Sequence, residues 1–152
     1  MLSTEIKNSL DASVLCWLAT ITKDGLPNVT PKEVFTPFGS DHLLIANIAS
    51  PGSVRNVKFN PNVCVSFVEV FDQRGFKLLG KAEIVGKNHS DYNEVHAPLY
   101  ALAGDSYPII SIFKIKVEKV EEINAPSYHL YPDIPETERR SSAMTNYGVK
   151  PL

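Results

Sequence analysis

Apolar and polar residues alternate along much of this chain with the period of two that is typical of β-strands. The alternation is clearest over residues 109–120, where Phe113, Ile115 and Val117 are separated by charged residues. Six stretches have strand character: residues 14–22, 28–35, 42–48, 62–71, 76–85 and 109–120. Because short turns join most of them, the pattern predicts a mainly β fold, a six-stranded antiparallel barrel that is closed or partly closed.

Two other segments space their apolar residues three or four apart, as one face of a helix requires. Residues 3–11 predict a short helix capped by Ser3, and residues 90–103 predict a longer one. Asp24-Gly25 marks a tight turn between the first two strands. Pro31 has no N–H to donate, so we expect its strand at a sheet edge, at a bulge or at the end of pairing.

The first strand is apolar on both of its faces. Its alternate positions are Val14, Cys16 and Leu18 on one side, and Leu15, Trp17, Ala19 and Ile21 on the other. A barrel wall normally keeps one face in water, so two apolar faces indicate cover by helices or by a second subunit. Symmetric dimers are the commonest oligomers, and we therefore favour a homodimer.

Residues 124–152 differ in character from the predicted barrel domain, residues 1–123. This segment combines four prolines with Tyr128, Tyr131 and Tyr147. Disordered tails are usually poor in aromatic residues. We therefore expect an extended C-terminal tail that is packed on the barrel or on the partner subunit.

Composition and charge narrow the function classes. The chain has 152 residues, 43% of them apolar, and a formal net charge of −2, so it lacks the basic surface that nucleic-acid binding requires. It contains no apolar run of membrane-spanning length and no basic-then-apolar leader, and we expect a cytoplasmic protein. Cys16 and Cys64 lie in apolar strands, which favours buried, reduced thiols. Neither cysteine has the spacing to a second cysteine or to a histidine that a metal site needs, so no metal is expected.

The turn after the third strand has the chemistry of a phosphate site. Ser50 is a good helix N-cap, Pro51 suits the first helical position, and Gly52 allows a ligand close to the backbone. The first-turn N–H groups, the hydroxyls of Ser50 and Ser53, and the Arg55 guanidinium could converge on a phosphate. An ordinary helix start followed by a solvated arginine would have the same sequence, so both interpretations stay open at this point.

The order of these elements resembles a known family, the pyridoxamine 5'-phosphate oxidase-like FMN-binding split barrels. The resemblance covers about residues 5 to 120 and is carried by four segments: 18–27, 44–57, 60–67 and 75–82. It implies a split barrel of the FMN-binding type. It also implies an obligate homodimer that holds FMN at the subunit interface.

The resemblance assigns cofactor-binding roles to particular residues of this chain. Ala46 and Asn47 would line the flavin ring or the ribityl chain, and Thr30, Pro31 and Lys32 would run along the isoalloxazine. The phosphate would be held by Ser50, Gly52, Ser53 and Arg55, with Asn56 contacting it or bracing the turn. Lys32 would stabilise the reduced ring, although a surface lysine on an edge strand explains it equally well. Lys77 would approach the flavin from the partner chain.

One departure from the family pattern argues against the oxidation of pyridoxamine phosphate itself. Pyridoxamine phosphate oxidases resemble one another in a C-terminal stretch of arginine, histidine and tryptophan, whereas this chain has no tryptophan after Trp17. We therefore expect an FMN-dependent oxidoreductase that acts on another small molecule, with no side chain standing out as an acid or a base. The alternatives are a non-catalytic flavin-binding or electron-carrier module, or a barrel for deazaflavin, haem or pyridoxal phosphate.

Overall fold

The computed structural model describes residues 1–151, which form a curled seven-stranded antiparallel sheet, five α-helices and one 3₁₀ turn. The strands are β1 (Cys16–Ile21), β2 (Pro27–Lys32), β3 (Phe35–Phe38), β4 (His42–Asn47), β5 (Asn62–Glu69), β6 (Arg74–Gly86) and β7 (Ser111–Asn124). The helices are α1 (Thr4–Ala12), α2 (Pro51–Phe59), α3 (Tyr92–Ala103), α4 (Ser127–Leu130) and α5 (Glu136–Tyr147), with the 3₁₀ turn at Gly104–Ser106. None of the helices within residues 1–151 is both long enough and apolar enough to cross a membrane.

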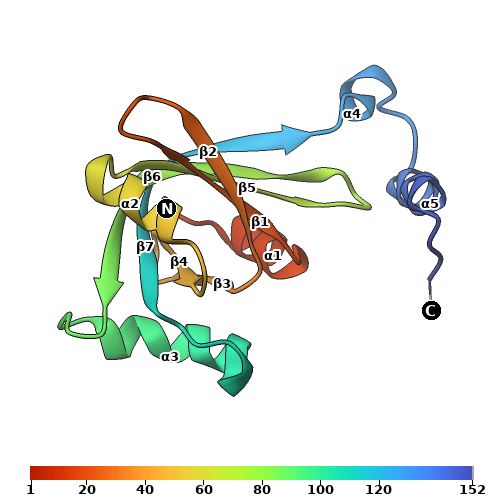
Figure 1. The fold of residues 1–152 in the computed structure, drawn as a ribbon. Helices are drawn as coiled ribbons and strands as arrows, with labels where there is room; N and C mark the ends of the chain where they lie inside the picture. The colour runs from red at the N-terminus through yellow and green to blue at the C-terminus, as the bar shows by residue number, and fades with distance from the viewer. Residues whose placement is uncertain (152) are drawn as a thin grey trace.

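The strand order β2-β1-β5-β6-β7-β4-β3 explains why the sheet curls. β2 and β3 lie at opposite edges of the sheet, yet only Glu33 and Val34 separate them in the chain. The two edges must therefore approach each other, and the sheet closes into a barrel with a split between β2 and the β3–β4 pair (Figure 1). The prediction of a mainly β split barrel is confirmed, but with seven strands instead of six.

The seventh strand arises because the predicted strand over residues 28–35 is two strands. β2 ends at Lys32, and β3 begins at Phe35 after a bend at Glu33 and Val34. No glycine, proline or asparagine marks this bend, so the sequence carries no turn signal there. The edge position expected from Pro31 is confirmed, since β2 pairs only with β1.

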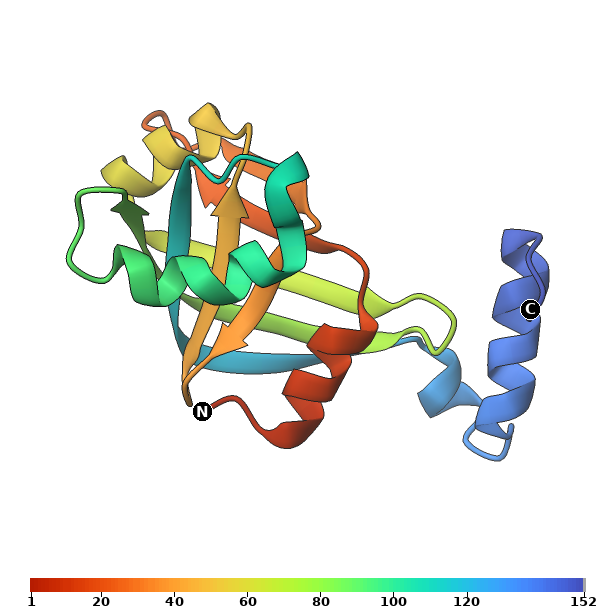
Figure 2. The same ribbon diagram turned by 90° about the horizontal axis from the view of Figure 1, so that it is seen from below.

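Two hydrophobic clusters cover opposite sides of the barrel wall. The inner cluster fills the barrel, and α1 contributes Ile6 and Leu10 to it. The outer cluster lies between α3, through Val95 and Leu99, and the outward faces of β4 and β7 (Figure 2). β4 is therefore buried on both faces, which accounts for its uninterrupted apolar run.

The predicted cap of α1 is confirmed, whereas the predictions for the first strand and for Cys64 are confirmed only in part. Ser3 caps α1, with its hydroxyl accepting a hydrogen bond from the Ile6 N–H at 3.3 Å. On β1, Cys16 and Leu18 point into the barrel as predicted, but Val14 precedes the strand and is 83% exposed. Cys64 was also expected to be buried. It is only half-buried, because it lies on the outer face of β5, opposite Ala19 of β1.

The C-terminal segment is not extended, and that prediction is wrong. After β7 it forms α4 and then α5, a twelve-residue helix beside the tip of the β5–β6 hairpin and away from the barrel (Figures 1 and 2). The helix begins after Pro135, carries Glu136 and Glu138 in its first turn and ends at Gly148 with a φ of 68°. These are ordinary helix start and stop signals.

Ion pairs and ring contacts hold α5 to the hairpin tip. Arg140 contacts Asp72 at 2.6 Å and Glu69 at 3.2 Å, and the ring of Tyr147 meets that of Phe71 edge-on with centroids 6.0 Å apart. Ala143 is buried against this tip region. Most of the other residues of α5 are polar and exposed.

We expect Arg140→Ala to loosen α5 without disturbing the barrel. Partly exposed ion pairs contribute about 1 kcal/mol or less, so amide exchange in α5 should quicken roughly fivefold at low salt. Hydrogen exchange followed by mass spectrometry measures this, with Lys150→Ala as the exposed control. Equal protection of α5 in both variants would show that the ion pairs of Arg140 do not hold the helix.

Candidate functional site

The split between β2 and β4 forms a cleft of about 550 Å³. One wall comes from the end of β2 and the bend after it, and the other comes from the end of β4 and the turn into α2. Its lining residues are Leu15, Trp17, Pro31, Lys32, Glu33, Val34, Ala46, Ile48, Ala49, Ser50 and Tyr107. The cleft is mostly apolar with a few polar groups, as expected of a site for a small organic ligand.

Helix α2 begins directly after Ser50, the residue that ends this wall of the cleft. Ser50 occupies the N-cap position and Pro51 the first helical position, as predicted. The Ser50 hydroxyl, however, does not cap the helix. The backbone N–H of Ser50 donates to the side-chain oxygen of Asn47 at 3.0 Å. The Ser50 hydroxyl accepts a hydrogen bond from Lys32. No side chain within residues 1–151 caps α2, so its first-turn donors remain available to an anion.

Lys32 is a buried cation in this cleft. Its side chain is only 7% exposed, and its Nζ donates to the Ser50 Oγ at 2.6 Å. Burial lowers the pKa of the Lys32 ammonium. Among residues 1–151, no carboxylate lies within ion-pair distance of it. The alternative of a surface lysine on an edge strand is therefore wrong, because the strand is at the edge but the side chain points inward.

A row of polar side chains, here called the β2–α2 seam, joins the edge strand to the helix. Thr30 and Asn28 of β2 reach the Ser53 hydroxyl at 3.3 and 3.5 Å. Asn56 of α2 and Asn28 both donate to the Thr20 hydroxyl, at 3.0 and 3.2 Å. Ser53 is 1% exposed, so it lies inside the seam and not on the solvent side of the helix. The seam fixes the position of α2 relative to Lys32.

Arg55 lies on the outer side of the first turns of α2. Its side chain is exposed, and a methyl group built on Gly52 would lie 3.9 Å from its guanidinium nitrogen Nη2. The guanidinium therefore lies near the start of the helix and leaves the Gly52 backbone uncovered. Arg55, Gly52 and the first-turn donors together present positive charge and N–H groups on one side of the turn.

Two predicted residues at the end of β4 have different environments. Ala46 lines the cleft. The Asn47 side chain is 5% exposed and uses its amide as a brace, accepting from Ser50 N–H and donating to the Ser111 Oγ at 2.9 Å. Asn47 thus holds the turn against β7.

Lys77 lies outside the cleft of its own chain. It is on the outer face of β6, where its Nζ forms an ion pair with Glu121 at 2.6 Å. Hydrogen bonds from Lys119 and Lys77 lower the pKa of Glu121 to about 2. Any ligand contact by Lys77 would have to come from its position on this outer face.

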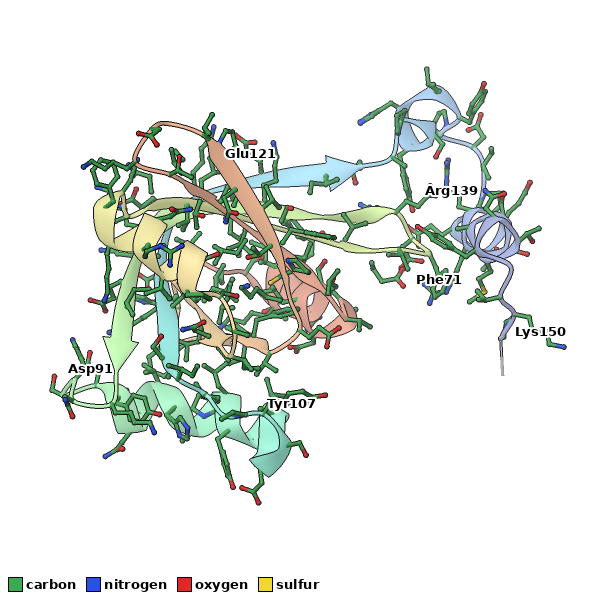
Figure 3. The ribbon with its side chains drawn as sticks, in the orientation of Figure 1. Phe71, Asp91, Tyr107, Glu121, Arg139 and Lys150 are labelled. Carbon is green, nitrogen blue, oxygen red and sulfur yellow. The ribbon has the colours of Figure 1, made fainter. Side chains whose placement is uncertain are left out.

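Sequence reasoning missed several residues that shape the site. Tyr107 lines the cleft from the connection between α3 and β7 (Figure 3), and nothing in its local sequence indicates this. Asn28 was also missed, although a signal was present. Asn28, Thr30 and Lys32 alternate along β2, so three polar residues share the face that the barrel pattern would leave to apolar ones.

The family model described as pyridoxamine 5'-phosphate oxidase matches residues 2–124, which is the barrel without the C-terminal helices. No curated protein sequence matches the chain.

Several solved structures share the fold. HupZ of Group A Streptococcus superposes with a TM-score of 0.70 at 21% identity, over 82% of this chain and 99% of its own. An FMN-binding protein from Syntrophomonas wolfei gives 0.69 at 12% identity, over 82% and 87% of the two chains. An F420 reductase gives 0.60 at 18% identity, over 78% of this chain and 98% of its own. At these identities the likeness shows the split-barrel fold, while the family match covers most of the sequence. This chain therefore belongs to the pyridoxamine 5'-phosphate oxidase family.

Proposed function

We propose that this protein is an FMN-binding flavoprotein that acts as a flavin-dependent oxidoreductase on a small molecule. The observation that carries the proposal is the buried, unpaired cation Lys32 beside the uncapped N-terminus of α2 in one cleft. A buried ammonium without a counter-charge is costly, and an anionic ligand would remove that cost. FMN offers two anionic features, its phosphate and the pyrimidine edge of its reduced ring. The fold that this chain shares with an FMN-binding protein from Syntrophomonas wolfei supports this choice.

The residues present divide naturally between these two features. Arg55, Gly52 and the first turn of α2 would hold the phosphate, with Ser53 and Thr30 behind them in the seam. The apolar walls near Ala46 and Pro31 suit a flat ring. When bound, FMN supplies one- and two-electron chemistry, while the protein supplies orientation and electrostatics. The positive charge of Lys32 would favour the reduced flavin and raise its reduction potential.

A homodimer is part of the proposal. A second groove, of about 230 Å³, runs along β5 and shares Leu15 and Trp17 with the cleft. Val14 is 83% exposed and Trp17 44% exposed on this apolar face. A second copy seated here would cover the face and close the cleft, and it could bring its Lys77 to the ligand. Light scattering should then give twice the chain mass.

A purified sample prepared without added cofactor tests the function directly. We expect a yellow protein that releases about one FMN per chain on heating. A colourless protein that does not bind added FMN would overturn the proposal. The F420 reductase among the structural relatives makes a deazaflavin the competing ligand, and its different absorption spectrum separates the two.

Gly52→Ala separates ligand binding from protein packing. A methyl group there meets no atom closer than 3.9 Å, and alanine is the better helix former by about 0.5–1 kcal/mol. We therefore expect a slightly higher melting temperature together with severalfold weaker FMN binding, because the methyl group blocks approach to the backbone. Fluorescence titration and thermal melting measure the two effects. Unchanged affinity would place the phosphate elsewhere.

A further inference from the structure

α3 carries a row of aromatic rings, of which only Tyr92 packs against the outer hydrophobic cluster. Tyr92, His96 and Tyr100 follow one another at four-residue spacing, with ring centroids 5.0 and 5.6 Å apart and planes within 27° and 23° of parallel. The helix is anchored through its other face, by Val95 and Leu99. Tyr100 is 45% exposed. Aromatic residues gathered on a surface mark binding sites more often than scattered ones do.

The chain after α3 turns this row into a groove. The Tyr100 hydroxyl donates to the carboxylate of Asp105, which fixes the 3₁₀ turn beside the ring. Asp91 precedes the first residue of α3, and Tyr107 follows the 3₁₀ turn beyond its last (Figure 3). The groove between them has a volume of about 240 Å³, and Tyr107, Pro108 and Ile109 complete its wall. Lys87 lines it as well and forms no ion pair within residues 1–151.

We propose that this α3 groove binds a purine nucleotide. Stacked rings offer flat edges and an exposed end face to a planar heterocycle. The Asp105 carboxylate and the His96 ring nitrogens can pair with an exocyclic amino group and with ring nitrogens. The Lys87 ammonium, having no protein partner, supplies the charge that a phosphate needs. The groove therefore offers contacts both to the base and to the phosphate of a purine nucleotide.

The α3 groove is separate from the flavin cleft but shares one wall with it. Tyr107 lines both, and it is the only residue common to the two linings. A nucleotide in the groove would contact one face of Tyr107 and leave the rest of the cleft untouched. The inference does not depend on the flavin, so each can fail without the other.

Isothermal titration of the purified full chain with AMP tests this inference. We expect saturable AMP binding, no binding of ribose 5-phosphate, and weaker binding of adenosine. Tyr100→Leu should weaken AMP and adenosine at least tenfold. Lys87→Gln should weaken AMP only. Tyr131→Leu, which removes an exposed tyrosine outside the groove, is the matched control and should change neither.

Three outcomes would overturn the inference: no AMP binding at millimolar concentration, equal affinity in Tyr100→Leu and the control, or competition between AMP and FMN. The last would place AMP in the flavin cleft. Circular dichroism of Tyr100→Leu checks that α3 remains folded. If α3 does not remain folded in Tyr100→Leu, the exposed substitution Lys87→Gln tests the inference instead. It should lower the affinity for AMP relative to that for adenosine.

Discussion

Replacing Lys32 by methionine is expected to stabilise the FMN-free protein and to weaken FMN binding at the same time. Methionine fills similar space without burying a charge, which typically gains about 1–2 kcal/mol, or roughly 2–8 °C in melting temperature for a chain of this size. The loss of the cation should weaken FMN binding roughly 10- to 100-fold, because hydrogen bonds to charged groups contribute about 1.5–3 kcal/mol. Thermal melting and flavin fluorescence titration give the two values. Lys58→Met, the same substitution at an exposed lysine of helix α2, should alter neither.

The stability difference should depend on pH in a defined direction. Burial lowers the pKa of Lys32 below its usual 10.5 in the folded state, while the unfolded chain keeps the usual value. Between those two pKa values the unfolded state binds more protons, so the wild-type free energy of unfolding rises with pH. The advantage of Lys32→Met should therefore shrink as the pH is raised from neutrality toward 10.5. A constant advantage, or a destabilised variant, would contradict this account of Lys32.

Combining Arg55→Ala with Ser53→Ala should release FMN while the barrel stays folded. Arg55 is exposed, so its removal should cost little stability. Ser53 is buried, and its loss removes the partner of the Thr30 hydroxyl and one of the two partners of Asn28, for a cost of about 1 kcal/mol. The two changes remove about 2–3 kcal/mol of phosphate binding, or roughly 30- to 150-fold in Kd.

The two single variants show how much of the lost FMN affinity comes from Arg55 on the helix surface and how much comes from Ser53 in the β2–α2 seam. If Arg55 acts directly, Arg55→Ala alone should account for most of the loss in affinity, and Arg55→Lys should recover part of it. The dissociation constants come from fluorescence titration, and circular dichroism checks that each variant is folded. FMN affinity equal to wild type in the double variant would remove α2 from the binding site.

The sequence was sufficient to predict the barrel because most of its strands have a recognisable pattern of apolar and polar residues within their own length. Alternation over β6 and β7, the Asp24-Gly25 turn and the apolar run of β4 can all be recognised from residues close together in the chain. The bend at Glu33 and Val34 does not. It is imposed by the closure of the sheet, a property of the whole strand order, and no residue there favours a turn.

The candidate site was accessible from sequence only where its residues are consecutive. Ser50, Pro51 and Gly52 identify a helix start, and the structure places one there. The inward direction of Lys32 depends on the pairing of β2 with β1, which fixes its register opposite Cys16. The brace between Asn47 and Ser111 joins positions 64 residues apart, so local pattern could not reveal it. The helix α5 was not predicted, because prolines and tyrosines flank it, although the signals for its start and its end were present.

The two-residue bend between β2 and β3 also determines how a ligand could enter. The two strands share no ladder of hydrogen bonds, so the walls of the split can separate without breaking any strand pairing. The bond between the Ala46 N–H and the Val34 carbonyl, at 2.9 Å, ties the bend to the opposite wall. Opening the split would break this bond, the Lys32–Ser50 hydrogen bond and the β2–α2 seam, but no strand pairing, so it should cost less free energy than unfolding.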